Sequence, residues 1–466
     1  MKKNLFFTVF IALCLILCVI PSLFMTAFRS DETIGNESRT DWPSVTKEDG
    51  TFNSRILEQM GSYFETHYAF RPQLITADAE IQSALFQVSN TDSVTVGSDG
   101  WLYYSSTLND YLGKNPLSER GVFNLAHNLS LVQSYVTAMG AKFLFMVPPN
   151  KNSLYPEHMP YYYSVSESDI RNRDHLGEKL EAAGVSYLDL FDLIGAQEET
   201  LYLKHDSHWN NKGAMMVYNR ALDLLEKEHE TYSQVPVRYD RIHKGDLSNM
   251  IYPSDNSLEE DYAYDYETLY EYVPGPASSD PVSVEDFRIE TSNPSAEDTL
   301  LMYRDSFGNT LIPILSNAFA HGYYAKSTPY PIARDMQQYT PDFVIIELVE
   351  RNLRNLAADP AVVPSPRRNI DPALLEVQPD LESSVQTLRA DANYIAFSGT
   401  VPEERIDGER RIYLAVQTPE GSMNLYEAYT VTNEEKDYGY AVYLPLSSFG
   451  TLEEAQQRKT VVYVEK

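Results

Sequence analysis

Short apolar runs alternate with helically patterned segments along the middle of the chain. Nearly continuous apolar runs, which are typical of buried strands, occupy residues 142–147, 185–190, 299–303, 318–325 and 343–348. The segments between them carry apolar residues at intervals of three and four, and they predict helices over 119–139, 169–183 and 212–229. This alternation is typical of an α/β fold in which helices flank a parallel sheet.

The chain before the first of these strands carries further predicted elements. Residues 52–88 show two apolar stripes at helical spacing, one on each side of Pro72. Residues 94–104 alternate in polarity around Ser98-Asp99-Gly100, which favours a β-hairpin. We assign these elements and the sheet to one folded unit, residues 51–357.

The pattern changes in the last part of the chain. Five prolines within residues 358–380 predict a stiff linker. Short alternating strands then recur through residues 381–466 at a spacing that predicts a small β-sandwich. Its tyrosines either bind carbohydrate or pack within the sheets, because an aromatic face suits both environments; they are Tyr413, Tyr426 and Tyr440.

The N-terminal apolar run is long enough to cross a membrane. It extends from Leu5 to Phe28 after Lys2 and Lys3, and at about 1.5 Å per residue it covers a bilayer core of about 30 Å. The two lysines favour a cytoplasmic N-terminus, so the bulk of the chain is expected outside the cytoplasm. We predict a single-pass transmembrane signal-anchor at residues 1–28; the alternative is a cleaved signal peptide.

Composition narrows the classes of partner. The polar segment 29–50 predicts a flexible stalk. The formal net charge of −30 argues against nucleic acid, because a phosphate backbone attracts clustered Lys and Arg. Both cysteines, Cys14 and Cys18, lie in the apolar run, so the folded part has neither a disulfide nor a cysteine metal site. We expect no metal and no cofactor.

Two polar motifs suggest chemistry. Asp206 and His208 are separated by one residue, so in an extended chain they point to the same side and the acid can orient the imidazole. Ser306 follows the predicted strand 299–303, which places it at the carboxyl end of the sheet. A serine hydroxyl needs a base and an orienting acid to act as a nucleophile. These three residues are the catalytic candidates.

Other polar residues lie where contacts to substrate are expected. The loop 148–155 leaves the carboxyl end of strand 142–147, so Asn150 and Lys151 are candidates for oxyanion or substrate contacts, or else ordinary residues of a surface loop. Trp209 either packs beneath His208 or stacks on a sugar. The acidic, tyrosine-rich segment 253–292 is either an insertion over the site or a solvated loop.

The two motifs resemble a known family. Asp206-Ser207-His208-Trp209, followed by Asn211-Lys212-Gly213-Ala214 and by Asp305-Ser306-Phe307-Gly308, is similar to the DHHW and alginate O-acetyltransferase-like branch of the SGNH hydrolases. Further matches, over residues 50–356, are Val147 to Lys151 with Tyr155-Pro156, Gly245-Asp246-Leu247 and Glu347 to Arg351. Two positions depart from the family pattern: position 207 is Ser where the family name carries a second His, and Arg304 stands where SGNH enzymes usually have Gly.

The resemblance implies a function. It adds Tyr155 and Arg351 to the oxyanion or substrate candidates, and it suggests a membrane-bound O-acyltransferase as the source of acetyl groups. We therefore predict an extracytoplasmic O-acetyltransferase that acts on a cell-envelope or secreted polysaccharide through an acyl-serine. A carbohydrate O-acetylesterase would use the same three residues, and a non-catalytic envelope protein for polysaccharide binding or assembly is the alternative of a different class.

Overall fold

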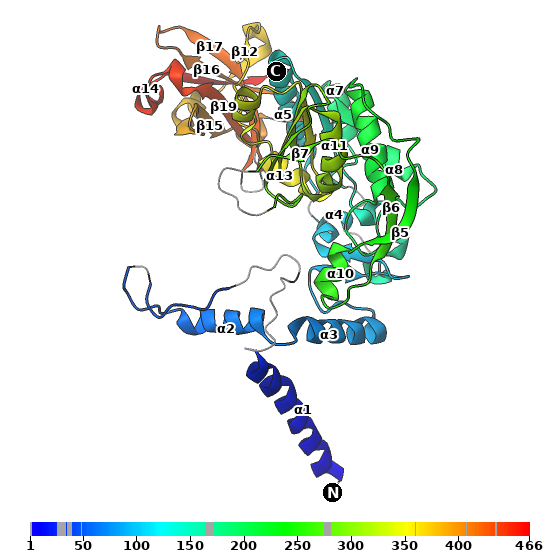
Figure 1. Ribbon diagram of the computed structural model, residues 1–466. Helices are drawn as coiled ribbons and strands as arrows, with labels where there is room; N and C mark the ends of the chain where they lie inside the picture. The colour runs from blue at the N-terminus through cyan, green and yellow to red at the C-terminus, as the bar shows by residue number, and fades with distance from the viewer. Residues whose placement is uncertain are drawn as a thin grey trace.

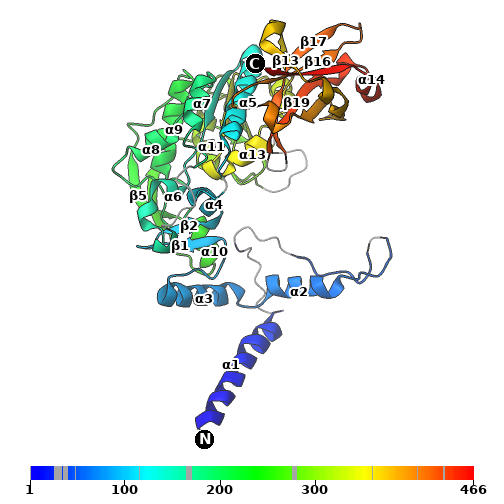
Figure 2. The same cartoon turned by 180° about the vertical axis from the view of Figure 1, so that it is seen from behind.

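The computed structural model describes residues 2–25, 34, 40–47, 49–114, 116–163, 171–274, 281–358, 360–406, 408–433 and 436–466. Its body is a central sheet with helices on both faces, and a second unit of two smaller sheets lies beside the body (Figures 1 and 2). The α/β class predicted from the alternation of apolar runs is confirmed.

Seven strands form the central sheet in the order β4-β3-β11-β9-β10-β8-β7. Their bounds in that order are Tyr187–Leu188, Lys142–Met146, Phe343–Glu347, Thr299–Tyr303, His321–Ala325, Arg288–Ser292 and Glu271–Tyr272. The first five run parallel, as predicted. β8 is antiparallel to β10 and β7 is antiparallel to β8, so the expectation of a wholly parallel sheet is wrong at this edge.

The acidic segment 253–292 causes this difference. It lacks the helical pattern that a parallel crossover needs, so the strands it supplies join the sheet antiparallel. The same segment provides β6 (Glu259–Tyr264), which pairs with β5 (Val237–His243) in a separate hairpin. Its described part forms three strands, so the alternative of a solvated loop is wrong.

Alternate residues of the parallel strands face two separate cores. Phe143 and Phe145 of β3 belong to one cluster, whereas Leu144 and Met146 belong to the other. The strand period of two places the side chains in this way, and both faces must be covered because both are apolar. Helices α5, α7, α12 and α13 cover the first face, and α9 and α11 cover the second.

The helices have the following bounds: α1 Lys2–Phe24, α2 Ile56–His67, α3 Arg71–Phe86, α4 Leu108–Tyr111, α5 Glu119–Ala138, α6 Lys151–Leu154, α7 Leu176–Ala182, α8 Leu190–Gly195, α9 Asn211–Leu224, α10 Asp246–Ile251, α11 Leu311–Ala318, α12 Ile332–Tyr339, α13 Leu353–Ala358 and α14 Leu452–Gln456. The predicted hairpin at 94–104 forms from β1 (Val94–Val96) and β2 (Leu102–Tyr104).

The C-terminal unit consists of two antiparallel sheets over one apolar core. The sheets have the orders β12-β17-β16-β20-β13 and β14-β15-β19-β18. Strand bounds are β12 Arg367–Arg368, β13 Leu375–Val377, β14 Gln386–Arg389, β15 Tyr394–Thr400, β16 Ile412–Gln417, β17 Met423–Glu427, β18 Tyr429–Asn433, β19 Lys436–Pro445 and β20 Thr460–Glu465. The predicted linker 358–380 thus contributes two strands, β12 and β13.

Two of the three tyrosines proposed to bind carbohydrate in this unit are in its interior. Tyr413 is 2% exposed and Tyr440 is 1% exposed, so neither ring is available to a sugar, and that part of the prediction is wrong. Tyr440 belongs to the apolar core between the two sheets, whereas Tyr413 is buried on the opposite side of β16 from its core residues Ile412 and Leu414. Tyr426 is half-buried.

Polar side chains of α5 attach this unit to the body. The amide nitrogens of Asn124 and Asn128 donate to the carbonyls of Asp437 and Thr430, each at 2.8 Å. Arg120, also on α5, donates to the carbonyls of Gly408 and Arg410. Because all three donors are buried, the attachment is part of the folded core.

The N-terminal elements lie at one end of the molecule (Figures 1 and 2). The segment predicted as a membrane anchor forms α1 over most of its length, and the stalk 29–50 falls largely outside the described residues. Among the helices that the structure describes, none is long and apolar enough to cross a membrane, so the predicted anchor is not confirmed.

Candidate active site

The structure brings Ser306, His208 and Asp206 together. β9 ends at Tyr303, and after Arg304 and Asp305 the chain enters η4, a 3-10 helix (Ser306–Thr310), so the hydroxyl of Ser306 lies at the carboxyl edge of the sheet. Oγ of Ser306 lies 2.7 Å from Nε2 of His208. Nδ1 of His208 lies 2.6 Å from Oδ1 of Asp206. These contacts form the hydrogen-bond chain of a serine, a base and an orienting acid.

The loop that carries Asp206 and His208 is a tight turn and not the extended segment expected from the sequence. Tyr202 and Trp209 pair as an isolated antiparallel bridge at its two ends. Within it, Oδ1 of Asp206 accepts from the backbone N–H of His208 at 2.9 Å, an arrangement typical of an aspartate-initiated turn. The carboxylate therefore fixes both the backbone and the ring of His208.

Asp206 is enclosed by hydrogen-bond donors. Its other oxygen, Oδ2, accepts from Nε2 of His243 and from the backbone N–H of Asp246, each at 2.9 Å. Burial alone would raise the pKa of Asp206, but the adjacent His208 and His243 outweigh burial and hold that pKa well below its usual range. Asp206 is therefore ionised at neutral pH.

His243 and Asp246 were not predicted as site residues. Gly245-Asp246-Leu247 belongs to the resemblance without a predicted role, and His243 lies on β5, a strand that the sequence pattern does not predict. The β5–β6 hairpin brings His243 to Asp206, a juxtaposition that no local pattern signals.

Three of these side chains also satisfy the geometry of a metal site. Ligand atoms of Asp206, His208 and Asp246 all lie within 4.8 Å of one another. Oδ1 of Asp206 and Nδ1 of His208 already face each other as a hydrogen-bonded pair, and Asp246 accepts from the backbone and hydroxyl of Ser207. The atoms that could bind a metal therefore already take part in internal hydrogen bonds, and these bonds orient the histidine.

Lys151 has a structural role and not the predicted one in oxyanion or substrate contact. Its Nζ donates to the carbonyls of Leu203, Lys204 and Asp206, and the side chain is 3% exposed. An ammonium has three donors, and all three are used here. Burial lowers the pKa of Lys151 to about 8. The residue fixes the loop that carries the acid.

Asn150 is also buried, and its side-chain oxygen accepts from the guanidinium of Arg351 at 3.5 Å. Its amide nitrogen donates to Oδ2 of Asp110 at 3.0 Å, and its backbone N–H donates to Oε2 of Glu350 at 3.0 Å. Burial raises the pKa of Glu350 to about 8. With 0% exposure, Asn150 cannot reach a substrate, so the prediction of a direct contact is wrong.

Trp209 packs under the site, which confirms one of its two predicted roles. It is 0% exposed, and its ring contacts that of Phe307, which in turn contacts the imidazole of His208. Its Nε1 donates to Oγ1 of Thr310 at 2.6 Å. A sugar cannot stack on a ring with no exposed surface, so the alternative role is wrong.

The last two candidates, Tyr155 and Arg351, are half-buried. The hydroxyl of Tyr155 accepts from the backbone N–H of Leu201 at 2.9 Å, which supports the turn from behind. The guanidinium of Arg351 lies 5.9 Å from the ring centroid of Phe307, the residue after Ser306. Of the five non-triad candidates, Arg351 is the one placed to meet a charge that develops beside the serine.

Arg304, which departs from the family pattern, is accommodated inside the fold. It is 0% exposed, and its guanidinium donates to the carbonyls of Val284 and Asp286 at 2.7 and 3.1 Å. Gly308 provides the space: a Cβ there would lie 2.6 Å from Cδ of Arg304. The buried position of the Arg304 side chain therefore requires a residue without a side chain at position 308.

Gly308→Ala should therefore destabilise the protein by about 1–3 kcal/mol, the usual effect of overpacking a filled site. Denaturant unfolding of the purified chain measures the change. Gly61→Ala is the matched control, because nothing lies within 4 Å of a Cβ at that position in α2. It should be neutral or stabilise by up to about 1 kcal/mol. Equal stability of the two variants would contradict the packing argument.

Comparisons with known proteins agree with the resemblance. Residues 94–284 match a family model described as the SGNH hydrolase-like domain of the acetyltransferase AlgX. The chain is 24% identical over 217 residues to the probable alginate O-acetylase AlgJ of Pseudomonas aeruginosa, a match that covers 45% of this chain and 53% of that protein. It is 29% identical over 159 residues to the probable alginate O-acetylase AlgJ of Pseudomonas syringae pv. tomato. This second match covers 32% of this chain and 38% of that protein.

These matches span about half or less of the length of the curated relatives. Among solved structures, a DHHW family protein from Eubacterium siraeum matches at 16% identity with a TM-score of 0.38, over 49% of this chain and 85% of that one. The resemblance predicted from the two motifs is confirmed: residues 94–284 are similar to the SGNH hydrolase-like domain of this acetyltransferase family. That span includes Asp206 and His208 and ends before Ser306.

Proposed function

We propose that this chain is an O-acetyltransferase that moves an acetyl group to a hydroxyl of a polysaccharide through an acetyl-serine. The observation that carries the proposal is the hydrogen-bond chain from Ser306 through His208 to Asp206. The family match and the names of the AlgJ relatives support the reaction class and a polysaccharide acceptor.

The first half-reaction acetylates the serine. Oγ of Ser306 attacks the carbonyl carbon of the donor ester while Nε2 of His208 takes the hydroxyl proton. His208 returns that proton to the departing alcohol. Asp206 holds Nδ1–H of the imidazole and stabilises the cation that forms. Ser306 is the first residue of η4, so its backbone N–H has no carbonyl partner within that helix. We assign this N–H and the guanidinium of Arg351 as the two donors to the oxyanion.

The second half-reaction releases the acetyl group to the acceptor. A sugar hydroxyl gives its proton to Nε2 of His208 and attacks the acetyl carbon, and Oγ of Ser306 leaves with the proton that His208 returns. Water in place of the sugar gives net hydrolysis, so an esterase would use the same residues. A transferase must therefore hold the acceptor as well as activate the serine.

Mass spectrometry distinguishes the two directions. The purified chain should convert an oligosaccharide and a small acetyl ester into a stable acetylated oligosaccharide. Net loss of acetyl from an already acetylated glycan, with no product in the forward direction, would establish an esterase and refute the transferase.

The location and the donor partner remain proposals from the sequence. Lys2 and Lys3 before the apolar run support a body outside the cytoplasm, where a membrane-bound O-acyltransferase would present acetyl groups.

The remaining alternative, a non-catalytic binding protein, loses its main support because Arg304 fits beside Gly308 without displacing Ser306 from His208.

A further inference from the structure

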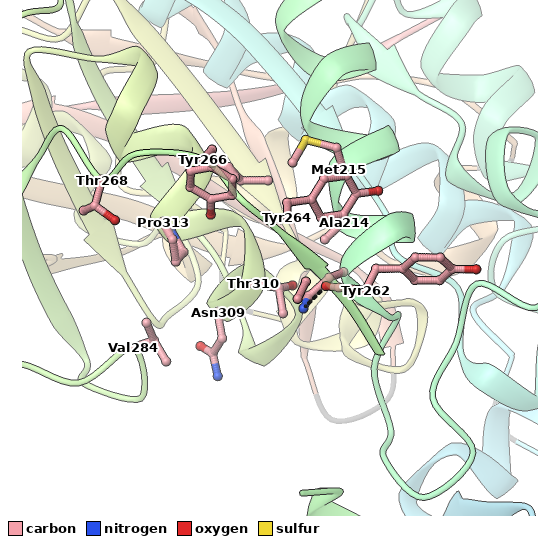
Figure 3. A pocket seen from close by; sticks show the side chains of 13 residues that line it. Ala214, Met215, Tyr262, Tyr264, Tyr266, Thr268, Val284, Asn309, Thr310 and Pro313 are labelled. Atoms are coloured by element: carbon pink, nitrogen blue, oxygen red, sulfur yellow. Dashed lines mark hydrogen bonds between the residues drawn. The ribbon is translucent and has the colours of Figure 1, made fainter. Parts of the chain in front are cut away.

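A pocket of about 460 Å³ opens beside the segment that carries Ser306 (Figure 3). Asn309 and Thr310 line it, and both belong to η4, the short helix that begins at the serine. Thr310 also accepts the hydrogen bond from Trp209, which follows His208. The three catalytic residues do not line the pocket themselves, but it lies against η4 within about one helical turn of the residue that carries the reacting hydroxyl.

Tyrosines line one side of the pocket, and the rings of Tyr264 and Tyr266 give it an aromatic wall, whereas the ring of Tyr262 packs against Tyr239. Tyr262 and Tyr264 are alternate residues of β6, and Tyr266 lies two residues further on. Tyr264 and Tyr266 are half-buried, and in Figure 3 they lie near Met215 of α9. Flat rings with hydroxyls at their edges suit a sugar, which has apolar C–H faces and polar rims. An acetyl group alone would leave most of this volume empty, whereas the volume is typical of sites for larger ligands.

None of the residues that line this pocket, all of them in the described part of the chain, carries a charge. The cations around it are engaged elsewhere. Lys212 pairs with Glu199 at 2.6 Å, and Lys326 pairs with Glu285 at 2.7 Å. Arg304 is buried and donates to backbone carbonyls. A carboxylate in the pocket would lose hydration, and no cationic side chain among the lining residues would compensate for that loss.

We propose that this pocket is the acceptor subsite, and that it takes a neutral hexose unit of a glycan in preference to a uronate. The inference rests on the proposed function, because it assigns the acceptor of the same serine. The net charge of −30 acts in the same direction by repelling a polyanion. Alginate is a polyuronate, so this acceptor differs from the one named for the AlgJ relatives.

The test measures how acetyl groups partition between acceptor and water. The purified full-length chain is given p-nitrophenyl acetate as donor, with either a neutral β-glucan tetrasaccharide or an oligouronate of the same length. Released p-nitrophenol counts all turnovers, and mass spectrometry counts acetylated sugar. We expect a transfer-to-hydrolysis ratio at least about tenfold higher with the neutral sugar. The preference should persist in high salt, because it originates in the pocket and not in the long-range field.

Variants of the pocket wall should change the same ratio. Tyr264→Leu removes a ring and should lower transfer to the neutral sugar about tenfold relative to hydrolysis, whereas Tyr264→Phe keeps the ring and should lower it less. Thr268→Trp fills the pocket from its exposed rim and gives an independent test that leaves the core unchanged. Tyr339→Leu is the matched control, because this half-buried tyrosine lies on α12 and packs on the opposite face of the sheet.

The outcomes separate the two proposals. Ester turnover that does not depend on Ser306 counts against the proposed function. Serine-dependent turnover with a ratio that neither pocket variant alters shows that the acceptor binds elsewhere. Equal or better transfer to the uronate, or a neutral preference that vanishes in high salt, refutes the neutral subsite.

Discussion

Ser306→Ala should reduce acetyl transfer and ester hydrolysis to the background rate, a loss of about 10⁴-fold or more. Alanine removes the atom that carries the acetyl group, and neither His208 nor Asp206 can substitute for it. In serine hydrolases the members of such a relay act as one unit, so loss of the nucleophile costs nearly the whole chemical step. Intact-protein mass spectrometry after a pulse of donor should also show an acetyl adduct on the native chain and none on the variant.

Ser134→Ala is the matched control for this prediction. The hydroxyl of Ser134 lies on the exposed side of α5 and donates to the carbonyl of Ser130. The control should retain full activity, and both variants should unfold at the same denaturant concentration as the native chain. An acetyl adduct that persists in Ser306→Ala would place the nucleophile elsewhere and remove the basis of the proposed function.

The parallel strands and the residues at their carboxyl ends could be predicted from the sequence. Runs such as 299–303 and 343–348 are apolar at nearly every position because both faces of the sheet are covered, and such runs are visible without a structure. The residue that follows one of these strands must lie at the edge of the sheet, which placed Ser306. The pairing with His208 was predicted from the resemblance, and the structure places the two side chains 2.7 Å apart.

The roles of Asn150, Lys151 and Trp209 could not be predicted in the same way. Loop position shows that a polar residue is near a site, but it does not show which way the side chain points. Lys151 points inward because three backbone carbonyls of the turn need donors, and the fold brings them together from residues 203–206. A lysine in such a loop looks the same in sequence whether its ammonium contacts substrate or backbone.

The β5–β6 hairpin is the largest element that the sequence did not reveal. Its strands are exposed or half-buried along most of their length, so no apolar alternation distinguishes them from a loop. This hairpin nevertheless supplies His243 to Asp206 and two tyrosines to the pocket beside Ser306. Tertiary contacts position it: the N–H of Asn211 at the start of α9 donates to Oδ1 of Asp261 on β6.

Asp206→Asn should lower kcat/KM for ester hydrolysis by about 10⁴-fold and should move the acid limb of its pH profile to lower pH. The asparagine amide would place N–H groups against Nε2 of His243 and the N–H of Asp246, which are donors to Asp206. If the amide turns to satisfy them, it presents N–H groups to Nδ1 of His208 and favours the wrong tautomer.

The direction of the pH shift follows from the pKa of His208. Burial acts to lower that pKa, but the charge and hydrogen bond of Asp206 outweigh burial and raise it. Only the neutral imidazole can take a proton from Ser306, so activity rises as pH increases through this pKa. Without the carboxylate the pKa falls, and the residual activity should persist to lower pH than in the native chain.

Rates from pH 5 to 9, measured with the same ester, test both parts of this prediction. Asp223→Asn, an exposed position on α9, is the control for removing one negative charge, and it should leave rate and profile unchanged. Asp246 also lies 3.7 Å from Nδ1 of His208, so Asp246→Asn shows which carboxylate orients the base. If Asp206→Asn loses less than tenfold while Asp246→Asn loses the greater part of the activity, Asp246 is the orienting acid and our assignment of Asp206 is wrong.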